Sequence, residues 1–342
     1  PQKTIFENIL QLPPGCSMRV IANREPVIRK YWDICDIAPE PDMTESEAIA
    51  GVMKLLDDAT NIRQHADVEI GAFLSGGIDS STVVGLMSLN QMSKVPTFSV
   101  GFEDSRFDES KYARLASYRF DTEHHSETFR MEDLVGLWRD VTFYNEQPHG
   151  DVSFLPTFLV SKLAAKQFKA VLTGDGSDEL FGGYDKYINF MTNEPSFDNP
   201  EEWAKRYAQS AGLINDGLAS KLFTSEFYEI YRNADPYKCL VDPIINSDKQ
   251  DPINRMLISD VTTLLPANNL VKPDRMGMAN SLEIRSPFLD YRLCELAFKI
   301  PGHLKLAQNE TKSLPKKAVE PLIGEKLTRR PKQMFTVPIG EW

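Results

Sequence analysis

Hydrophobic and polar positions follow two different periods in the first half of the chain. Apolar residues recur every three to four positions in 44–62, which predicts an amphipathic helix with Thr44 as its N-cap and Glu47 as the capping-box partner. Short apolar runs alternate after this helix with helical patterns. The predicted strands are 68–74, 95–100, 123–128 and 170–173, and the helices lie near 83–89, 108–120, 131–143 and 155–168. Strands that alternate with helices predict an α/β fold with a parallel sheet.

The strand pattern fades after residue 184. Helical patterns then recur near 200–212, 224–232, 251–265, 290–299 and 311–323. The residues before the first helix have only short extended runs around a Pro-Pro-Gly turn. We therefore expect three parts: a linker-like lead-in at 1–43, an α/β core at 44–190, and a mostly helical part at 191–342 that completes the same site.

Composition narrows the class of protein. Of the 342 residues 42% are apolar, enough for a sizeable core, and the net charge of −11 argues against broad nucleic-acid binding. The four cysteines form no CxxC pair and have no histidine at a metal-ligand spacing, which argues against disulfides and zinc and favours a reducing cytoplasm. No run approaches the roughly 20 apolar residues of a membrane span.

A glycine-rich loop, SGGIDSS at 75–81, joins a predicted strand to a predicted helix. Glycines let backbone N–H groups approach an anion, and a helix N-terminus adds unpaired donors and a positive dipole end. Asp79 would repel a phosphate unless a cation such as Mg²⁺ lies between them. The loop lacks the lysine of a Walker motif, and the alternative is a turn whose glycines serve geometry alone.

A second loop, TGDGSDELFGGY at 173–184, follows the last predicted strand. Asp175, Asp178 and Glu179 crowd within five residues and repel one another, so a metal ion or basic partners would stabilise the cluster. The alternative is a solvated acidic turn. Because the carboxyl ends of parallel strands share one edge of a sheet, both loops are expected at the ligand-binding edge.

The first loop resembles the SGGxDS loop of the PP-loop ATP pyrophosphatases, which cleave ATP between the α and β phosphates. The second loop, with the blocks at 271–276, 282–290 and 330–335, is similar to asparagine synthetases and their β-lactam synthetase-like relatives. The lead-in, with LPPG at 12–15 and YWD at 31–33, resembles the linker after that family's glutaminase domain. The resemblance implies a core of the adenine nucleotide alpha hydrolase type. It also implies that the family's glutaminase domain is absent from this chain.

The resemblance also implies the roles of individual residues. Asp79 and Asp178 match the acids that hold Mg²⁺ and pyrophosphate, Lys332 and Lys312 match lysines that stabilise developing charge, and Asp175 stands where many relatives carry a glutamate base. Lys316 and Lys317 lie close to Lys312 and leave its assignment open. The expected ATP-binding residues are Phe73, Leu74, Ser75, Gly76, Gly77, Asp79, Ser80, Val100, Thr173 and Gly174.

The substrate segment departs from the family pattern. Residues 146–156 correspond to a stretch that holds aspartate, with Asp151 and Ser153 as candidate contacts, but they contain no arginine. An α-carboxylate needs a cationic partner, which Arg275 or Arg285 could supply. Otherwise the substrate is a different carboxylate, such as a sugar acid or a natural product.

The resemblance implies an amide-forming ligase that uses ATP and Mg²⁺ to adenylate a carboxylate, first of all the aspartate side chain, and releases pyrophosphate. Ammonia from a glutaminase domain missing from this chain then gives the amide, asparagine, and AMP. We expect no nucleic-acid or membrane partner, and a homodimer is compatible with the sequence. Two rival hypotheses stay open. One is another PP-loop enzyme, of NAD-synthetase or tRNA-modifying type, and the other is an inactive nucleotide-binding scaffold.

Overall fold

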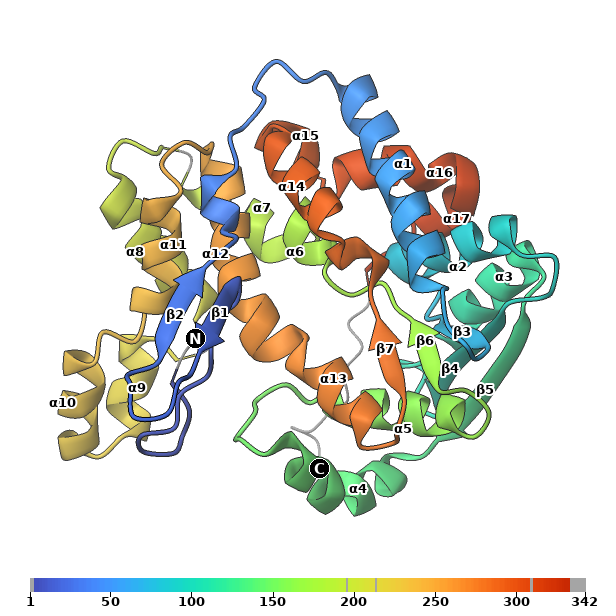
Figure 1. Ribbon diagram of the computed structural model, residues 1–342, viewed down its shortest axis with the longest axis horizontal. Helices are drawn as coiled ribbons and strands as arrows, with labels where there is room; N and C mark the ends of the chain where they lie inside the picture. Colours follow the sequence, from blue (N-terminus) through green and yellow to red (C-terminus); the bar gives the residue numbers. More distant parts are fainter. Residues whose placement is uncertain (1–2, 195, 213, 308–309, 333–342) are drawn as a thin grey trace. The chain divides into compact units, whose positions relative to one another are not determined.

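The computed structural model describes residues 3–194, 196–212, 214–307 and 310–332 (Figure 1). Contacts within the chain divide it into two compact units. The first, here called the helical unit, comprises Pro1–Thr44, Asp178–Pro266 and Ala297–Ser313. The second, here called the sheet unit, comprises Glu45–Ser177, Ala267–Leu296 and Leu314–Trp342.

A parallel five-stranded sheet with the order β5-β4-β3-β6-β7 forms the centre of the sheet unit (Figure 1). The strands are β3 (Ile70–Phe73), β4 (Pro96–Phe102), β5 (Glu123–Phe129), β6 (Ala170–Leu172) and β7 (Glu283–Arg285). Every residue of β4 is buried, as expected for an inner strand that is covered on both faces. The expectation of an α/β fold with a parallel sheet is confirmed.

Helices cover both faces of this sheet (Figure 1). One layer contains α4 (Met131–Asn145), α5 (Phe154–Ala165) and α13 (Val271–Met278). The other contains α1 (Glu45–Arg63), α2 (Ile78–Asn90), α3 (Ser110–Phe120) and α17 (Glu325–Thr328). Phe98 and Phe102 of β4 belong to the same buried cluster as Leu155 and Leu159 of α5. The main core therefore lies between the sheet and the α4–α5–α13 layer.

The connections create a reversal of strand order at β3. From β3 the chain builds β4 and β5 on one side, and β6 and β7 on the other. Open α/β sheets bind ligands outside the carboxyl ends of the strands where the order reverses. The two glycine-rich loops leave β3 and β6, the neighbouring strands at this point. The sequence pattern does not predict β7, a three-residue strand with charged ends.

The helical unit contains an antiparallel pair of strands, β1 (Cys16–Arg19) and β2 (Val27–Lys30), and many short helices. These include α7 (Asp185–Asn193), α8 (Pro200–Ala211), α9 (Asp216–Leu222), α10 (Ser225–Asn233), α11 (Lys238–Asn246), α12 (Pro252–Thr262) and α15 (Gly302–Lys305). Trp203 and Tyr207 of α8 are fully buried and pack against Phe190 of α7. Short helices α6 (Ser177–Phe181), α14 (Tyr291–Lys299) and α16 (Ser313–Ile323) each contain a boundary between the units.

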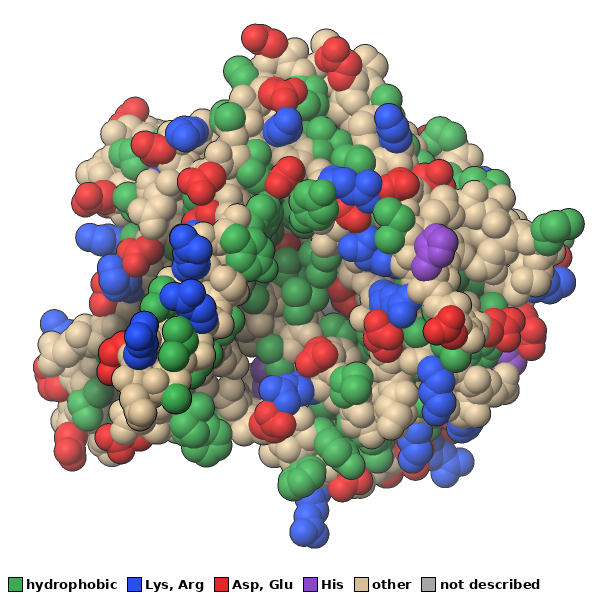
Figure 2. Space-filling model, viewed as in Figure 1, with side chains coloured by type: hydrophobic (Ala, Val, Ile, Leu, Met, Phe, Trp, Pro, Cys, Tyr) green, Lys and Arg blue, Asp and Glu red, His purple; other side chains and the backbone are tan. Residues whose placement is uncertain are grey.

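The lead-in exposes many large apolar side chains. Met18, Val27 and Ile28 of the β1–β2 pair and Phe6 before it are all more than two-fifths exposed. Figure 2 shows hydrophobic side chains at the surface in the region that Figure 1 assigns to these strands. Within the described residues, no helix has the length and apolar character needed to cross a bilayer.

Candidate active site

The first glycine-rich loop connects β3 to α2 through a compact hydrogen-bonded turn. The Ser75 hydroxyl accepts a hydrogen bond from the Gly77 N–H at 3.2 Å and lies 3.1 Å from the Ser80 hydroxyl. Gly76 has a φ of +72°, and a Cβ at this position would lie 2.2 Å from the backbone carbon of Tyr112. Only glycine fits this conformation and this approach. The 13-residue helix α2 therefore begins directly after a loop of small residues, and a helix N-terminus in this setting can bind an anion.

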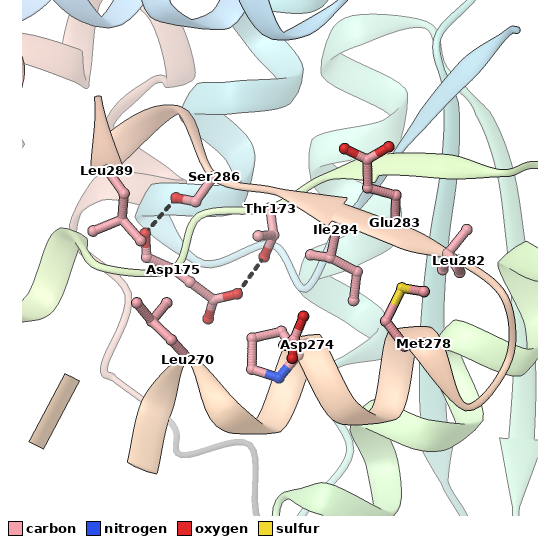
Figure 3. Close-up of a pocket in the computed structure, with 11 residues that line it drawn as sticks. Thr173, Asp175, Leu270, Asp274, Met278, Leu282, Glu283, Ile284, Ser286 and Leu289 are labelled. Atoms are coloured by element: carbon pink, nitrogen blue, oxygen red, sulfur yellow. Dashed lines mark hydrogen bonds between the residues drawn. The ribbon is translucent and has the colours of Figure 1, made fainter. Parts of the chain in front are cut away.

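The second glycine-rich loop continues from β6. The Thr173 N–H donates to the Arg285 carbonyl at 2.9 Å, and the Thr173 hydroxyl donates to Asp175 Oδ2 at 3.0 Å. The Ser286 hydroxyl donates to the Asp175 carbonyl at 2.5 Å (Figure 3). The backbone and the side chain of Asp175 are therefore both oriented by neighbouring strand ends.

The two loops touch at Gly174. A Cβ at this position would lie 2.6 Å from the Asp79 Cβ and 2.9 Å from the Ser80 nitrogen. The start of α2 can approach the second loop so closely because residue 174 has no side chain. The structure thus brings together Ser75, Gly76, Gly77, Asp79, Ser80, Thr173, Gly174 and Asp175 at one edge of the sheet.

Three further predicted nucleotide contacts, Phe73, Leu74 and Val100, belong to the strands themselves or follow them directly. Leu74 and Val100 are almost fully buried, and Phe73 packs against the core cluster. The Leu74 N–H donates to the Phe98 carbonyl and extends the β3–β4 pairing by one residue. Their contact with an adenine ring stays a prediction.

Asp178 belongs to the helical unit, where it pairs with Lys312 across 2.6 Å. Lys312 is 5% exposed, has a φ of +53°, and donates its backbone N–H to the Gly182 carbonyl. Two residues predicted to act on phosphate are therefore neighbours. Asp79 lies in the sheet unit, so its sharing of one Mg²⁺ with Asp178 stays a prediction. Within the described residues, no three or more His, Cys, Asp or Glu side chains form a group that could hold a metal.

A pocket of about 230 Å³ opens beside Asp175 in the sheet unit (Figure 3). It is lined by Thr173, Asp175, Leu270, Pro273, Asp274, Met278, Leu282, Glu283, Ile284, Ser286 and Leu289. These described lining residues combine apolar walls with three carboxylates and include no lysine or arginine. The hydrogen bond from Arg285 lowers the pKa of Glu283, which therefore stays ionised.

Asp151 and Ser153, the candidate contacts of the predicted substrate segment, form a cluster with Lys272, which the sequence does not predict. Lys272 on α13 donates to the Ser153 hydroxyl at 2.8 Å and lies 3.4 Å from Asp151. Asp151 also accepts from the N–H and hydroxyl of Ser153. Burial alone would raise the pKa of Asp151, but Lys272 and the Ser153 hydrogen bonds outweigh it and lower that pKa. The 271–276 block contains Lys272, but sequence gives no sign that this lysine meets residues more than 100 positions earlier.

Both arginines considered for an α-carboxylate already have partners. Arg275 pairs with Glu146 across 2.6 Å. Arg285 pairs with Glu283 and donates to the carbonyls of Arg63 and His65. A substrate carboxylate would have to compete with these groups for either guanidinium.

Lys332 is exposed in the sheet unit, and the rest of its block, residues 333–335, lies outside the described residues. Arg330, two residues earlier, has a side chain that is only 7% exposed and pairs with Glu109. Arg330 belongs to the family block at 330–335, but the sequence predicts no role for it. Its long-range partner, 221 positions away, explains why no local pattern revealed it.

Comparison with known proteins gives a consistent result. Residues 51–342 match the protein family described as asparagine synthase. A Mycobacterium bovis protein named provisionally as a glutamine-hydrolyzing asparagine synthetase is 30% identical over 99% of this chain and 56% of its own length. Asparagine synthetase 1 (glutamine-hydrolyzing) of Bacillus subtilis is 29% identical over 99% of this chain and 57% of its own. The amidase chry2 of Gibberella zeae is 27% identical over 99% and 60%. The chain thus spans little more than half the length of these relatives.

Proposed function

Because the chain belongs to the asparagine synthase family, whose members use ATP to form carbon–nitrogen bonds, we propose that it catalyses ATP-dependent amide synthesis through an acyl-adenylate. A carboxylate attacks the α-phosphorus of ATP and releases pyrophosphate. Ammonia then attacks the acyl carbon and releases AMP. The first candidate substrate is the side-chain carboxylate of aspartate, with asparagine as the product.

The contact between the two glycine-rich loops carries this proposal. Gly174 allows the start of α2 to lie against the loop that holds Asp175, so the predicted phosphate loop and the predicted base adjoin one another. Reacting groups held at such short range convert a bimolecular reaction into an effectively unimolecular one, which accounts for a large share of enzymatic rate enhancement.

Each residue that we propose as catalytic has a role that suits its surroundings. The Asp175 carboxylate, oriented by Thr173, borders the pocket and would accept the proton that ammonia loses as the amide forms (Figure 3). Lys332 and Lys312 would stabilise negative charge on the phosphates during adenylation. The ion pair with Asp178 fixes the position of the Lys312 ammonium group.

A magnesium ion prefers carboxylate and phosphate oxygens as ligands. Asp79 and Asp178 are the residues that we propose to hold it. Asp178 lies 2.6 Å from the ammonium group of Lys312, so this carboxylate is already placed beside a cation. When bound, Mg²⁺ would neutralise the charge of the departing pyrophosphate.

A second candidate substrate follows from the pocket. Its described lining contains no cationic side chain, and both Arg275 and Arg285 have acidic partners. A carboxylate with an apolar body, or one that carries an amine, matches Leu270, Met278 and the pocket acids better than a dicarboxylate does. Two relatives are named amidases and not asparagine synthetases, in keeping with a substrate other than aspartate.

We further propose that ammonia reaches the site from a glutaminase domain outside this chain. The relatives are named glutamine-hydrolyzing and are much longer than this chain, and the lead-in exposes apolar side chains that a neighbouring domain would cover. The four cysteines are all unpaired, which supports a cytoplasmic location. A homodimer remains part of the proposal.

ATP–pyrophosphate exchange tests the proposed function. The protein is incubated with Mg-ATP, labelled pyrophosphate and one carboxylate at a time: aspartate, sugar acids, β-amino acids and apolar amino acids. We expect label to enter ATP only with the cognate carboxylate. Labelled pyrophosphate is incorporated by attack on the acyl-adenylate, and this intermediate forms only from the cognate carboxylate. Exchange with aspartate selects the first candidate, and exchange with another acid selects the second. ATP binding without exchange with any carboxylate would contradict the function.

A further inference from the structure

Arg330 is a buried cation whose hydrogen bonds are incomplete. Its Nη2 donates to Glu109 Oε1 at 2.8 Å, and its guanidinium carbon lies 4.6 Å above the centre of the Tyr112 ring. The two charged side chains are 7% and 9% exposed. The Nη1 atom is buried and has no hydrogen-bond partner among the described residues.

The guanidinium lies beside the first glycine-rich loop. A Cβ at Gly77 would lie 3.4 Å from Arg330 Nη2. Gly76 packs against the backbone of Tyr112, the residue whose ring carries the guanidinium. Glu109 and Tyr112 both belong to the start of α3, so one helix end supports the loop and the arginine together. All of these residues belong to the sheet unit.

An unmade hydrogen bond on a buried charged group is costly, and such groups in native proteins usually have a specific reason. Glu109 balances the charge of Arg330 but accepts from only one of its terminal nitrogens. Burial raises the pKa of Glu109, and Arg330 opposes that rise only in part. A second anion next to Nη1 would complete the hydrogen bonding of this pair.

We propose that Arg330 is a phosphate-binding residue of the nucleotide site, with Nη1 donating to the pyrophosphate portion of ATP held by residues 75–77. Glu109 and Tyr112 act as positioning residues, because they orient the guanidinium without touching the nucleotide. The assignment rests on the proposed ATP-dependent function. The ion pair between Arg330 and Glu109 also anchors the backbone two residues before Lys332.

The rival explanation is that Arg330 only neutralises Glu109. Nucleotide binding by three variants separates the two explanations. Arg330→Gln removes the cation, Arg330→Lys keeps the charge but not the planar donor pair, and the double variant Glu109→Gln with Arg330→Gln removes both charges. Arg329→Gln serves as the control, because that neighbouring arginine is exposed and pairs with Glu320 outside the loop.

The measurement is equilibrium binding of Mg-ATP, inorganic pyrophosphate and AMP, with melting curves to confirm folding. For Arg330→Gln we expect affinity for ATP and pyrophosphate to fall about 10–100-fold, the range for a charged hydrogen bond, and affinity for AMP to change less than about threefold. Arg330→Lys should lose less than Arg330→Gln, and Arg329→Gln should bind like the wild type. The double variant should remain as weak as Arg330→Gln.

Recovery of ATP affinity in the double variant would show that Arg330 merely neutralises Glu109, and wild-type affinity in Arg330→Gln would overturn the assignment directly. An equal loss for AMP, ATP and pyrophosphate would also overturn it, because that result indicates general distortion of the site. The binding assay needs no carboxylate. A wild-type protein that binds ATP but shows no pyrophosphate exchange would therefore refute the proposed function and leave this test intact.

Discussion

At the scale of residues, the aspartates of the candidate site have different hydrogen-bond and ion-pair partners. Asp151 is tied to Lys272 and Ser153, and Asp178 to Lys312. Asp175 accepts a hydrogen bond from the Thr173 hydroxyl and borders a pocket. A carboxylate at the border of a pocket can reach the proton of a group bound there, which suits Asp175 to proton transfer.

Lys332→Ala tests the role of the last described residue. We expect amide formation to fall about 10²–10³-fold, the usual cost of removing one electrostatic stabiliser of a transition state. ATP binding should persist, because the glycine loops and the start of α2 are unchanged. Lys326→Ala is the matched control, an exposed lysine in the same unit. Steady-state turnover with a parallel ATP-binding titration measures both effects, and unchanged turnover in Lys332→Ala would refute its role.

Local chemistry explains which site residues could be predicted from sequence. The glycines and serines of 75–81 are recognisable because a phosphate loop needs them in consecutive positions. Lys272 and Arg330 act through partners that are distant in sequence, Ser153 and Glu109, and no local spacing encodes those contacts. Sequence alone also does not predict that Lys312 is buried and Lys332 exposed, because burial depends on the folded chain.

At the scale of elements, long periodic segments are predicted best. The helix expected at 44–62 is α1 (Glu45–Arg63), and the four predicted strands correspond to β3, β4, β5 and β6. By contrast, β7 is only three residues long, and its charged ends hide the period of a strand. Helices α7, α9, α11 and α13, each of nine residues or fewer, are not predicted either, whereas α10 and α14 are predicted although each also has nine residues.

Gly76→Ala tests the contact between the first loop and α3. The substitution adds a Cβ where φ is +72° and where Tyr112 backbone atoms lie within 2.4 Å. We expect a loss of about 1–3 kcal/mol or more in the free energy of unfolding, with weaker ATP binding. Gly136→Ala in α4 is the control, because no atom lies within 4 Å of the added Cβ, and it should gain about 0.5–1 kcal/mol. Equal stability of both variants in urea titrations would contradict the close packing.

At the scale of the whole molecule, each unit contains a buried charged residue with polar partners, Asp290 in the sheet unit and Lys305 in the helical unit. Asp290 anchors Arg63 and Arg292 in the sheet unit, and hydrogen bonding by Arg292 lowers the pKa of Asp290 to about 2. Lys305 is fully buried in the helical unit, where it donates to Asn254 and lies 4.5 Å from the Phe298 ring centre. Burial lowers the pKa of Lys305 to about 7, although nearby Asp251 opposes this shift.

This lysine makes stability depend on pH. Between about pH 7 and pH 10.5, Lys305 is mostly neutral in the folded chain and protonated in the unfolded chain. The unfolded state binds more protons, so the contribution of Lys305 to stability rises with pH across this window. Lys305→Met should therefore raise the melting temperature most near pH 7, and its advantage should shrink toward pH 10. A constant advantage across these pH values, or the same trend in exposed Lys249→Met, would contradict this account.

The position of one oxygen atom tests the central claim most directly. The protein is supplied with ATP, Mg²⁺, ammonium and the cognate carboxylate labelled with ¹⁸O in both oxygens, and the nucleotide product is analysed by mass spectrometry. An acyl-adenylate requires that the carboxylate oxygen bonded to phosphorus leave with AMP, so we predict AMP that contains one ¹⁸O and unlabelled pyrophosphate. Unlabelled AMP, or ADP with labelled phosphate, would contradict the mechanism.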